Sequence, residues 1–116
     1  MANRASTRSM QTIRFVIDSN ALAAPFVYTV GQDVEVVEIR TLTGSAVGFT
    51  LTVRNGANQI ATVTSGGVIN DVDSALSMDP AFIDIAAGGT ITVQTSDALA
   101  RCRVTIFVLP GVTAAS

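Results

Sequence analysis

Short stretches of alternating apolar and polar residues recur along the chain. Phe49, Leu51 and Val53 are separated by threonines, and Ile91 and Val93 follow the same alternation. Successive side chains of a β-strand point to opposite faces, so this pattern predicts strands with one buried and one exposed face. We expect a single core to hold Phe49, Leu51, Val53, Ile91, Val93, Val104 and Ile106.

Turn residues divide these stretches into eight predicted strands. Asn55–Asn58 and the pair Gly88–Gly89 each lie between two of them and predict hairpin connections. Many short strands without a long helical pattern indicate a sandwich or a barrel, and eight strands are typical of a jelly roll. The predicted fold is all-β, an antiparallel eight-stranded β-sandwich that is jelly-roll-like, with strands near residues 12–17, 25–30, 33–41, 47–54, 59–64, 82–86, 90–95 and 101–109.

One predicted strand changes phase halfway along. Its apolar positions are Val34 and Val36, and then Val37 and Ile39. A β-bulge is the simplest cause, because it adds one residue and reverses the facing of the side chains that follow. The alternative is a strand that is buried on both faces.

Residues 66–81 do not show the strand pattern. Asp71 or Asp73 could cap a short helical turn that runs to Met78, and Pro80 would end it. We therefore expect a long excursion with one helical turn between two strands.

The composition includes few of the side chains that enzymes commonly use for catalysis. Hydrophobic residues make up 48% of the 116 residues and charged residues 14%, which suits one packed domain. Histidine, lysine and tryptophan are absent, so no histidine can activate a serine, a threonine or Cys102. Cys102 is the single cysteine and we expect it in the core. We expect no enzyme, no cofactor and no zinc site.

The densest acidic cluster is Asp71 and Asp73, with Asn70 and Asp79 close by in the sequence. Loops rich in oxygen ligands bind Ca²⁺, but the EF-hand pattern fails because Ala75 replaces a ligand and the closing glutamate is missing. A solvated loop whose carboxylates cap turns is the preferred interpretation, and cation binding by this loop stays open.

Positive charge is concentrated at the N-terminus. Arg4, Arg8 and Arg14 all precede the first acid, Asp18, although the whole chain has a net charge of −2. Residues 1–11 predict an extended arm and residues 12–116 a single domain. The arginines are candidates for binding an acidic partner surface, and the alternative is a frayed tail with incidental charge. The acidic balance argues against nucleic acid as the partner, and no apolar run approaches the ~18 residues of a membrane span.

The last predicted strand is apolar on both faces. One face carries Cys102, Val104 and alternate residues after them, and Phe107 and Leu109 point the other way. A two-sheet domain covers only inner faces, so Phe107 and Leu109 are candidates for a subunit interface. Cover by the arm or by a loop of the same chain is the alternative.

A small β-domain rich in Val, Thr, Ala and Gly, poor in charge, lacking His and Trp and preceded by a basic polar arm resembles the decoration (cement) proteins of tailed-phage heads. The resemblance is one of composition and strand layout over about residues 25–109, together with the arm. It implies a structural virion protein on the outer surface of the capsid, a homo-oligomer with a trimer favoured, and the major capsid protein as partner. The absence of lysine departs from the family.

Two other classes of function compete with this one. A carbohydrate-binding or adhesive module of a virion fibre or spike would use the loops at 43–48, 55–59 and 66–81, and it predicts aromatic residues at their tips. Only Phe82 comes near them. An enzyme with an acidic active site is the third class, and the residues present leave it little chemistry.

Overall fold

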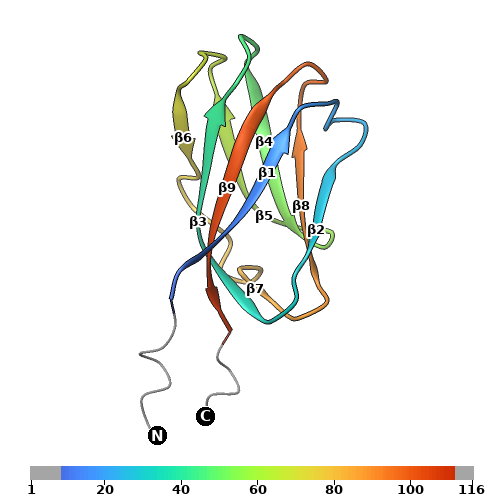
Figure 1. The fold of residues 1–116 in the computed structure, drawn as a ribbon, viewed down its shortest axis with the longest axis vertical. Helices are drawn as coiled ribbons and strands as arrows, with labels where there is room; N and C mark the ends of the chain where they lie inside the picture. Colours follow the sequence, from blue (N-terminus) through green and yellow to red (C-terminus); the bar gives the residue numbers. More distant parts are fainter. Residues whose placement is uncertain (1–8, 112–116) are drawn as a thin grey trace, which may run out of the picture.

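β-Strands are the only regular elements in residues 9–111, the part of the chain that the computed structural model describes. They form two antiparallel sheets packed face to face, which confirms the predicted all-β sandwich (Figure 1). The strands are β1 (Gln11–Ile17), β2 (Phe26–Thr29), β3 (Val34–Thr43), β4 (Phe49–Asn55), β5 (Asn58–Ser65), β6 (Val72–Ser74), β7 (Asp84–Ile85), β8 (Thr90–Thr95) and β9 (Cys102–Pro110).

The chain passes repeatedly between the two sheets. Sheet A has the strand order β1-β9-β3-β6, with β7 also paired to β3, and sheet B has the order β2-β8-β4-β5. The antiparallel pairs are nested along the sequence: β4 pairs with β5, β3 with β6, β2 with β8 and β1 with β9. As a result the start of β1 lies beside the end of β9, with Gln11 opposite Val108 (Figure 1).

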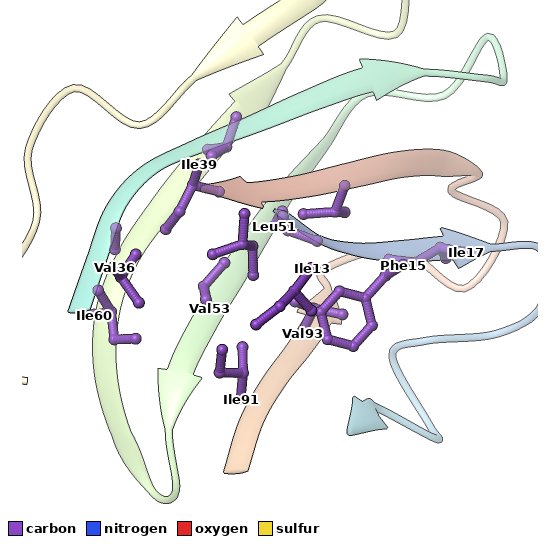
Figure 2. Close-up of a cluster of buried hydrophobic side chains, with 14 of the residues drawn as sticks. Ile13, Phe15, Ile17, Val36, Ile39, Leu51, Val53, Ile60, Ile91 and Val93 are labelled. Carbon is purple, nitrogen blue, oxygen red and sulfur yellow. The ribbon is translucent and has the colours of Figure 1, made fainter. Parts of the chain in front are cut away.

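The core lies between the inner faces of the two sheets. All seven residues predicted to share one core are buried in a single cluster, which confirms that prediction. Figure 2 shows Val36 and Ile39 of sheet A meeting Ile60, Leu51 and Val53 of sheet B. Each fully buried side chain of this size contributes about 1.5–3 kcal/mol, so the inner faces stabilise the sandwich without a disulfide.

The phase change in β3 is a β-bulge, as the sequence predicted. Val36 is opposite Val108 and Glu38 is opposite Phe107, so Val37 is the additional residue. Val36 is buried before the bulge and Ile39 after it. A second irregularity, in which Val53 faces Ala61 and Arg54 faces Gln59, lies between β4 and β5 and was not predicted.

The excursion over residues 66–81 differs from its prediction. It contains β6 and no helical turn, and with β6 the described chain has nine strands instead of eight. β6 pairs with β3, Thr41 lying opposite Asp73. β6 has only three residues, Val72–Ser74, and its single apolar side chain, Val72, is 62% exposed, so it gives no strand pattern in the sequence. Asp79 instead holds a tight turn, its carboxylate accepting a hydrogen bond from the Ala81 backbone N–H at 3.0 Å.

The loops after β1, β3, β5 and β8 lie together at the end of the sandwich away from Gln11 (Figure 1). Arg101 joins three of them. Its Nη1 donates hydrogen bonds to the carbonyl oxygens of Ser19 at 3.3 Å and Ala98 at 3.0 Å, and its own carbonyl accepts one from Gly44 N–H at 2.7 Å. Arg101 is therefore a structural residue of the loop end.

Of the predicted N-terminal arm, residues 1–11, the structure describes only residues 9–11. Gln11 already belongs to β1, and Ser9 and Met10 are exposed and precede the sheet. Residues 1–8 lie outside the described part of the chain.

Candidate functional site

The outer face of sheet A, meaning the side chains of β1, β9, β3 and β6 that point away from the core, carries the candidate site. Strand pairing arranges these side chains in rows across the sheet. One row is Val16, Arg103, Leu42 and Val72, and the next is Arg14, Thr105, Arg40 and Ser74. Two adjacent rows thus mix three arginines with aliphatic side chains.

These rows surround a shallow hollow of ≈ 520 Å³ in the outer face of sheet A. None of its lining residues is acidic, although the chain has a net charge of −2. The hollow is therefore a local positive surface on an acidic protein. Its lining residues are Thr12, Arg14, Phe15, Val16, Arg40, Thr41, Leu42, Val72, Arg103, Val104, Thr105 and Phe107.

The three arginines of the hollow differ in their own partners. Arg40 Nε donates to Glu38 Oε2 at 2.5 Å, and its guanidinium lies over the Phe107 ring. Arg14 and Arg103 are exposed and form no ion pair with any residue in the range 9–111. Two fully available guanidinium groups therefore flank the hollow, and the third is partly engaged.

The other four arginines lie elsewhere. Arg54 is on the outer face of sheet B, where its Nη1 donates to Gln94 Oε1 at 2.8 Å. Arg101 holds the loop end together. Arg4 and Arg8, two of the predicted partner-binding residues, fall outside the described residues. Of that predicted set only Arg14 can be placed, and it lies in the hollow.

Phe107 and Leu109, the candidates for a subunit interface, face away from the core as predicted. Cys102, Val104, Ile106 and Val108 are buried, and Phe107 and Leu109 are half-buried on the opposite side. Phe107 lies opposite Thr12 and lines the hollow, and Leu109 lies opposite Glu35, outside it. Arg40 of the neighbouring strand β3 lies over the Phe107 ring, and it belongs neither to the arm nor to a loop.

Arg40 and Arg103 were not among the candidate residues chosen from the sequence. Both could have been identified as outward-facing by continuing the alternation of their strands. Their proximity to Arg14 could not, because it depends on the pairing of β3 and β1 with β9, which joins segments far apart in the chain.

The other candidate reactive or metal-ligating side chains, Cys102 and the acidic residues, do not form a second site in residues 9–111. Burial raises the pKa of the Cys102 thiol from 9.0 to about 11, so the thiol stays protonated at neutral pH. Asp71 is exposed beside the short strand β6. Within residues 9–111 no three acidic, cysteine or histidine side chains gather closely enough to hold a metal ion.

The loops proposed for carbohydrate binding do not form one site. The loops at 43–48 and 66–71 meet at the loop end, where Asn70 N–H donates to the Thr43 carbonyl at 2.8 Å. The hairpin at 55–59 lies at the opposite end of the sandwich (Figure 1). Phe82 is half-buried and packs against the core.

Comparison with known proteins adds no family to this description. No family model matches the chain, and no curated protein matches it. In the described range 9–111 there is no helix of the length and apolarity that crossing a bilayer requires.

Proposed function

We propose that this chain is a non-enzymatic structural protein of a phage particle that decorates the outer surface of the capsid and stabilises it. The observation that carries the proposal is the positive hollow of sheet A, which adjoins the strand that follows the basic N-terminal segment. Arg14 lies in the hollow, and Arg4 and Arg8 precede it in the sequence, so positive charge gathers in this part of an acidic chain's sequence. Arginine suits this role because its planar fork of donors matches a carboxylate.

The nested strand pairing supports the same proposal. Apart from β7, the first strand pairs with the last and each inner pair is enclosed by the next. We infer that this order makes the domain a jelly roll, an architecture used by viral capsid domains. It agrees with the resemblance to decoration proteins stated from the composition.

In this proposal the ligand is the assembled shell of the major capsid protein. A protein that binds only the assembled shell raises the free energy needed to take it apart. A trimer in contact with several shell subunits would bind with higher avidity than one domain, because later contacts form at high effective concentration. Phe107 and Leu109 remain the predicted contacts between copies.

The test uses heads of the phage whose genome encodes the chain, prepared from a mutant that lacks it. The purified chain should co-sediment with these assembled shells and not with unassembled shell subunits. It should also raise the temperature at which the shells come apart. Absence of co-sedimentation, or equal binding to unassembled subunits, would overturn the proposal.

A further inference from the structure

β1 is an open edge of sheet A. It pairs with β9 on one side, in an unbroken register from Gln11 to Ile17, and no other strand of residues 9–111 pairs with it (Figure 1). The other sheet ends are less open. β2 and β6 have only four and three residues, and β5 contains a register shift and accepts a hydrogen bond from Asp79 N–H at its Ile60 carbonyl. An open edge of regular backbone groups is a template for a further strand.

The hydrogen bonds of sheet A show which backbone groups of β1 point outward. Gly44 N–H donates to the Arg101 carbonyl, where the chain enters the β3–β9 pair. Backbone groups of an antiparallel strand turn alternately to its two neighbours. The odd-numbered residues of β9 therefore bond to β3, and the even-numbered ones, beginning with Cys102, bond to β1.

The partners of these even-numbered residues on β1 include Ile13 and Phe15. The backbone groups of Thr12, Arg14 and Val16 consequently point away from β9. They form no hydrogen bond with any other described residue. Their side chains are exposed on the outer face of sheet A. Three residues of β1 thus present both outward backbone groups and open side chains.

Sheet A also leaves part of the inner face of β2 uncovered. Phe26 is opposite Val93 and Tyr28 is opposite Ile91, so both side chains are on the core side of sheet B. Val93 and Ile91 are fully buried, but Tyr28 is 44% exposed. Tyr28 lines a hollow of ≈ 260 Å³ together with Ile13 of β1. One more strand beside β1 would extend sheet A over Tyr28.

The surroundings of this edge define the side chains that such a strand should carry. Its residues opposite Thr12, Arg14 and Val16 would lie on the outer face, and the residues between them would face β2. Arg14 forms no ion pair with any residue in the range 9–111, and a carboxylate directly opposite it makes a favourable cross-strand pair. The hollow beside Tyr28 has no charged lining residue, so aliphatic side chains suit the positions that face β2.

Three other occupants fit this edge less well. If two copies paired through β1 so that all the outward residues bond, Arg14 would be opposite the same residue of the other copy, and like charges directly opposite each other destabilise a strand pair. Residues 1–8 of this chain contain Arg4 and Arg8 but no acid to pair with Arg14. A nucleic acid has no peptide groups with which to continue the sheet.

We propose that the edge of β1 binds an extended segment of a partner protein as an additional antiparallel strand of sheet A. The segment has an acidic residue opposite Arg14 and an aliphatic residue on each side of it, facing β2. Peptide hydrogen bonds to Thr12, Arg14 and Val16 provide the affinity, and the alternate side chains provide the specificity. The identity of the partner as the shell protein rests on the proposed function, and the chemistry of the segment rests on the pairing of sheet A.

The test measures amide hydrogen exchange of the isotope-labelled chain by NMR, with and without a peptide that contains Thr-Val-Glu-Val-Thr between Gly-Ser flanks. In the free chain the amides of Thr12, Arg14 and Val16 should exchange rapidly, and those of Ile13 and Phe15 slowly. The peptide should slow exchange at the first three. No protection at millimolar peptide, or protection confined to another strand, would overturn the inference.

Methylated peptides test the backbone pairing directly. Methylation of the glutamate nitrogen removes the N–H that would bond to the Arg14 carbonyl, and it should weaken binding by about tenfold. Methylation of a valine nitrogen, which would point away from β1, is the matched control and should leave binding unchanged. If both methylated peptides bind as tightly as the parent peptide, or both lose binding equally, the proposed strand pairing is wrong.

Variants of the chain test the side-chain contacts. Arg14→Gln should weaken peptide binding about two- to fivefold, as expected for a cross-strand ion pair. Arg54→Gln, on the opposite sheet, is its control for net charge. Tyr28→Ser should also weaken binding, and Val27→Ser, which changes an exposed residue on the outer face of the same strand, should not. Equal effects of a variant and its control would contradict the assigned contact.

The free chain also reveals the other occupants. If Thr12, Arg14 and Val16 are already protected and deletion of residues 1–8 exposes them, the chain's own segment occupies the edge and the inference is wrong. If their protection rises with the concentration of the chain alone, a second copy occupies the edge, and the inference is equally wrong.

Val16→Pro separates this inference from the proposed function. It removes an N–H that points away from β9, so the pairing of β1 with β9 is kept while the added strand loses a hydrogen bond. Its melting temperature checks the fold, and the methylated peptides decide if it does not fold. If shells bind folded Val16→Pro as well as the parent chain, decoration stands and the edge is not the docking surface. If the peptide binds β1 while shells do not bind the chain, the segment chemistry stands and the capsid is not the partner.

Discussion

The guanidinium carbon of Arg40 lies 5.2 Å from the centroid of the Phe107 ring. Such a contact at an exposed site stabilises by about 0.5–1 kcal/mol. It keeps an aromatic ring partly covered on the outer face of a sheet and engages one of the three arginines of the hollow. Phe107 is therefore covered in part by Arg40 of its own chain, and the rest of its side chain is accessible.

Phe107→Asp should dissociate the predicted homo-oligomer without unfolding the sandwich. The side chain is half-buried and points away from the core, so the fold loses little. A carboxylate at this position removes the apolar ring from the subunit contact, and burying its charge costs free energy even beside Arg40, whose guanidinium is already paired with Glu38. Size-exclusion chromatography with light scattering measures the oligomer, and the melting temperature reports the fold. Phe107→Leu is the control. Unfolding of the variant would assign Phe107 to the core, and an unchanged oligomer would place the interface elsewhere.

Removal of residues 1–8 should weaken attachment to shells and leave the free domain equally stable. The first strand of the described range, β1, begins at Gln11, so the deletion leaves every described strand intact. Co-sedimentation measures attachment, and thermal unfolding measures stability. A comparable fall in the melting temperature of the free domain would show that this segment is part of the fold.

Two buried threonines of β3 should respond oppositely to replacement by valine. Thr43 Oγ1 lies 2.6 Å from Ser65 Oγ in a buried hydroxyl pair that joins sheet A to sheet B. Thr43→Val should lower the free energy of unfolding by about 1–2 kcal/mol, because Ser65 loses this partner. Thr41 Oγ1 is buried without a hydrogen-bond partner among the described residues. Thr41→Val should be neutral or stabilising. Chemical denaturation measures the free energy of unfolding of both variants. Equal decreases for Thr43→Val and Thr41→Val would contradict the hydrogen bonding assigned to the two hydroxyls.

Gly67→Ala should destabilise the loop end. Gly67 has a φ of 80°, and a Cβ at this position would lie 2.6 Å from Gly48 N. Left-handed backbone alone costs an alanine about 1–2 kcal/mol, and the contact with the β3–β4 loop adds to it. Gly56 has a φ of 60° with open space around it, so Gly56→Ala isolates the backbone cost. Gly67→Ala should unfold at lower denaturant than Gly56→Ala. Equal denaturation midpoints for the two variants would show that Gly67 is not in close contact with the β3–β4 loop.

The Cys102 thiol should make stability fall at alkaline pH. Its pKa is about 11 in the folded chain, against 9.0 for an ordinary thiol, because burial disfavours the thiolate. The unfolded chain therefore releases this proton first, and the free energy of unfolding should fall as pH rises from about 9 to about 11. At pH 8 a thiol reagent should label the unfolded chain and not the folded one. Cys102→Ala should lack this contribution to the pH dependence. Rapid labelling of the native chain would contradict the burial of Cys102.

The sequence predicted the strands of the sandwich well because their signal is local. Leu51 and Ile91 alternate with polar residues, and the slip at Val36–Val37 carried enough information to place a bulge. β6 was missed because it has only three residues, which pair through their backbones and do not alternate between apolar and polar types over a recognisable length. The expected helical turn before Met78 did not form, because this segment follows β3 and then turns at Asp79.

The candidate site was only partly predictable for a different reason. Arg14 was identified from the charge of its own segment. Its neighbours Arg40 and Arg103 belong to strands whose register is fixed by contacts distant in sequence. Alternation shows which face a side chain takes and does not show which strand will lie beside it.

The nested pairing also sets an order for synthesis on the ribosome. β4 and β5 adjoin in sequence and can pair soon after they emerge, but β1 must wait for β9, almost the whole length of the domain later. During this interval β1 has no strand to pair with, and its apolar side chains Ile13, Phe15 and Ile17 are not yet buried in the core. The nascent chain therefore exposes an unpaired apolar strand. Release of the last strand from the exit tunnel is therefore the event that completes sheet A and, with it, the positive hollow.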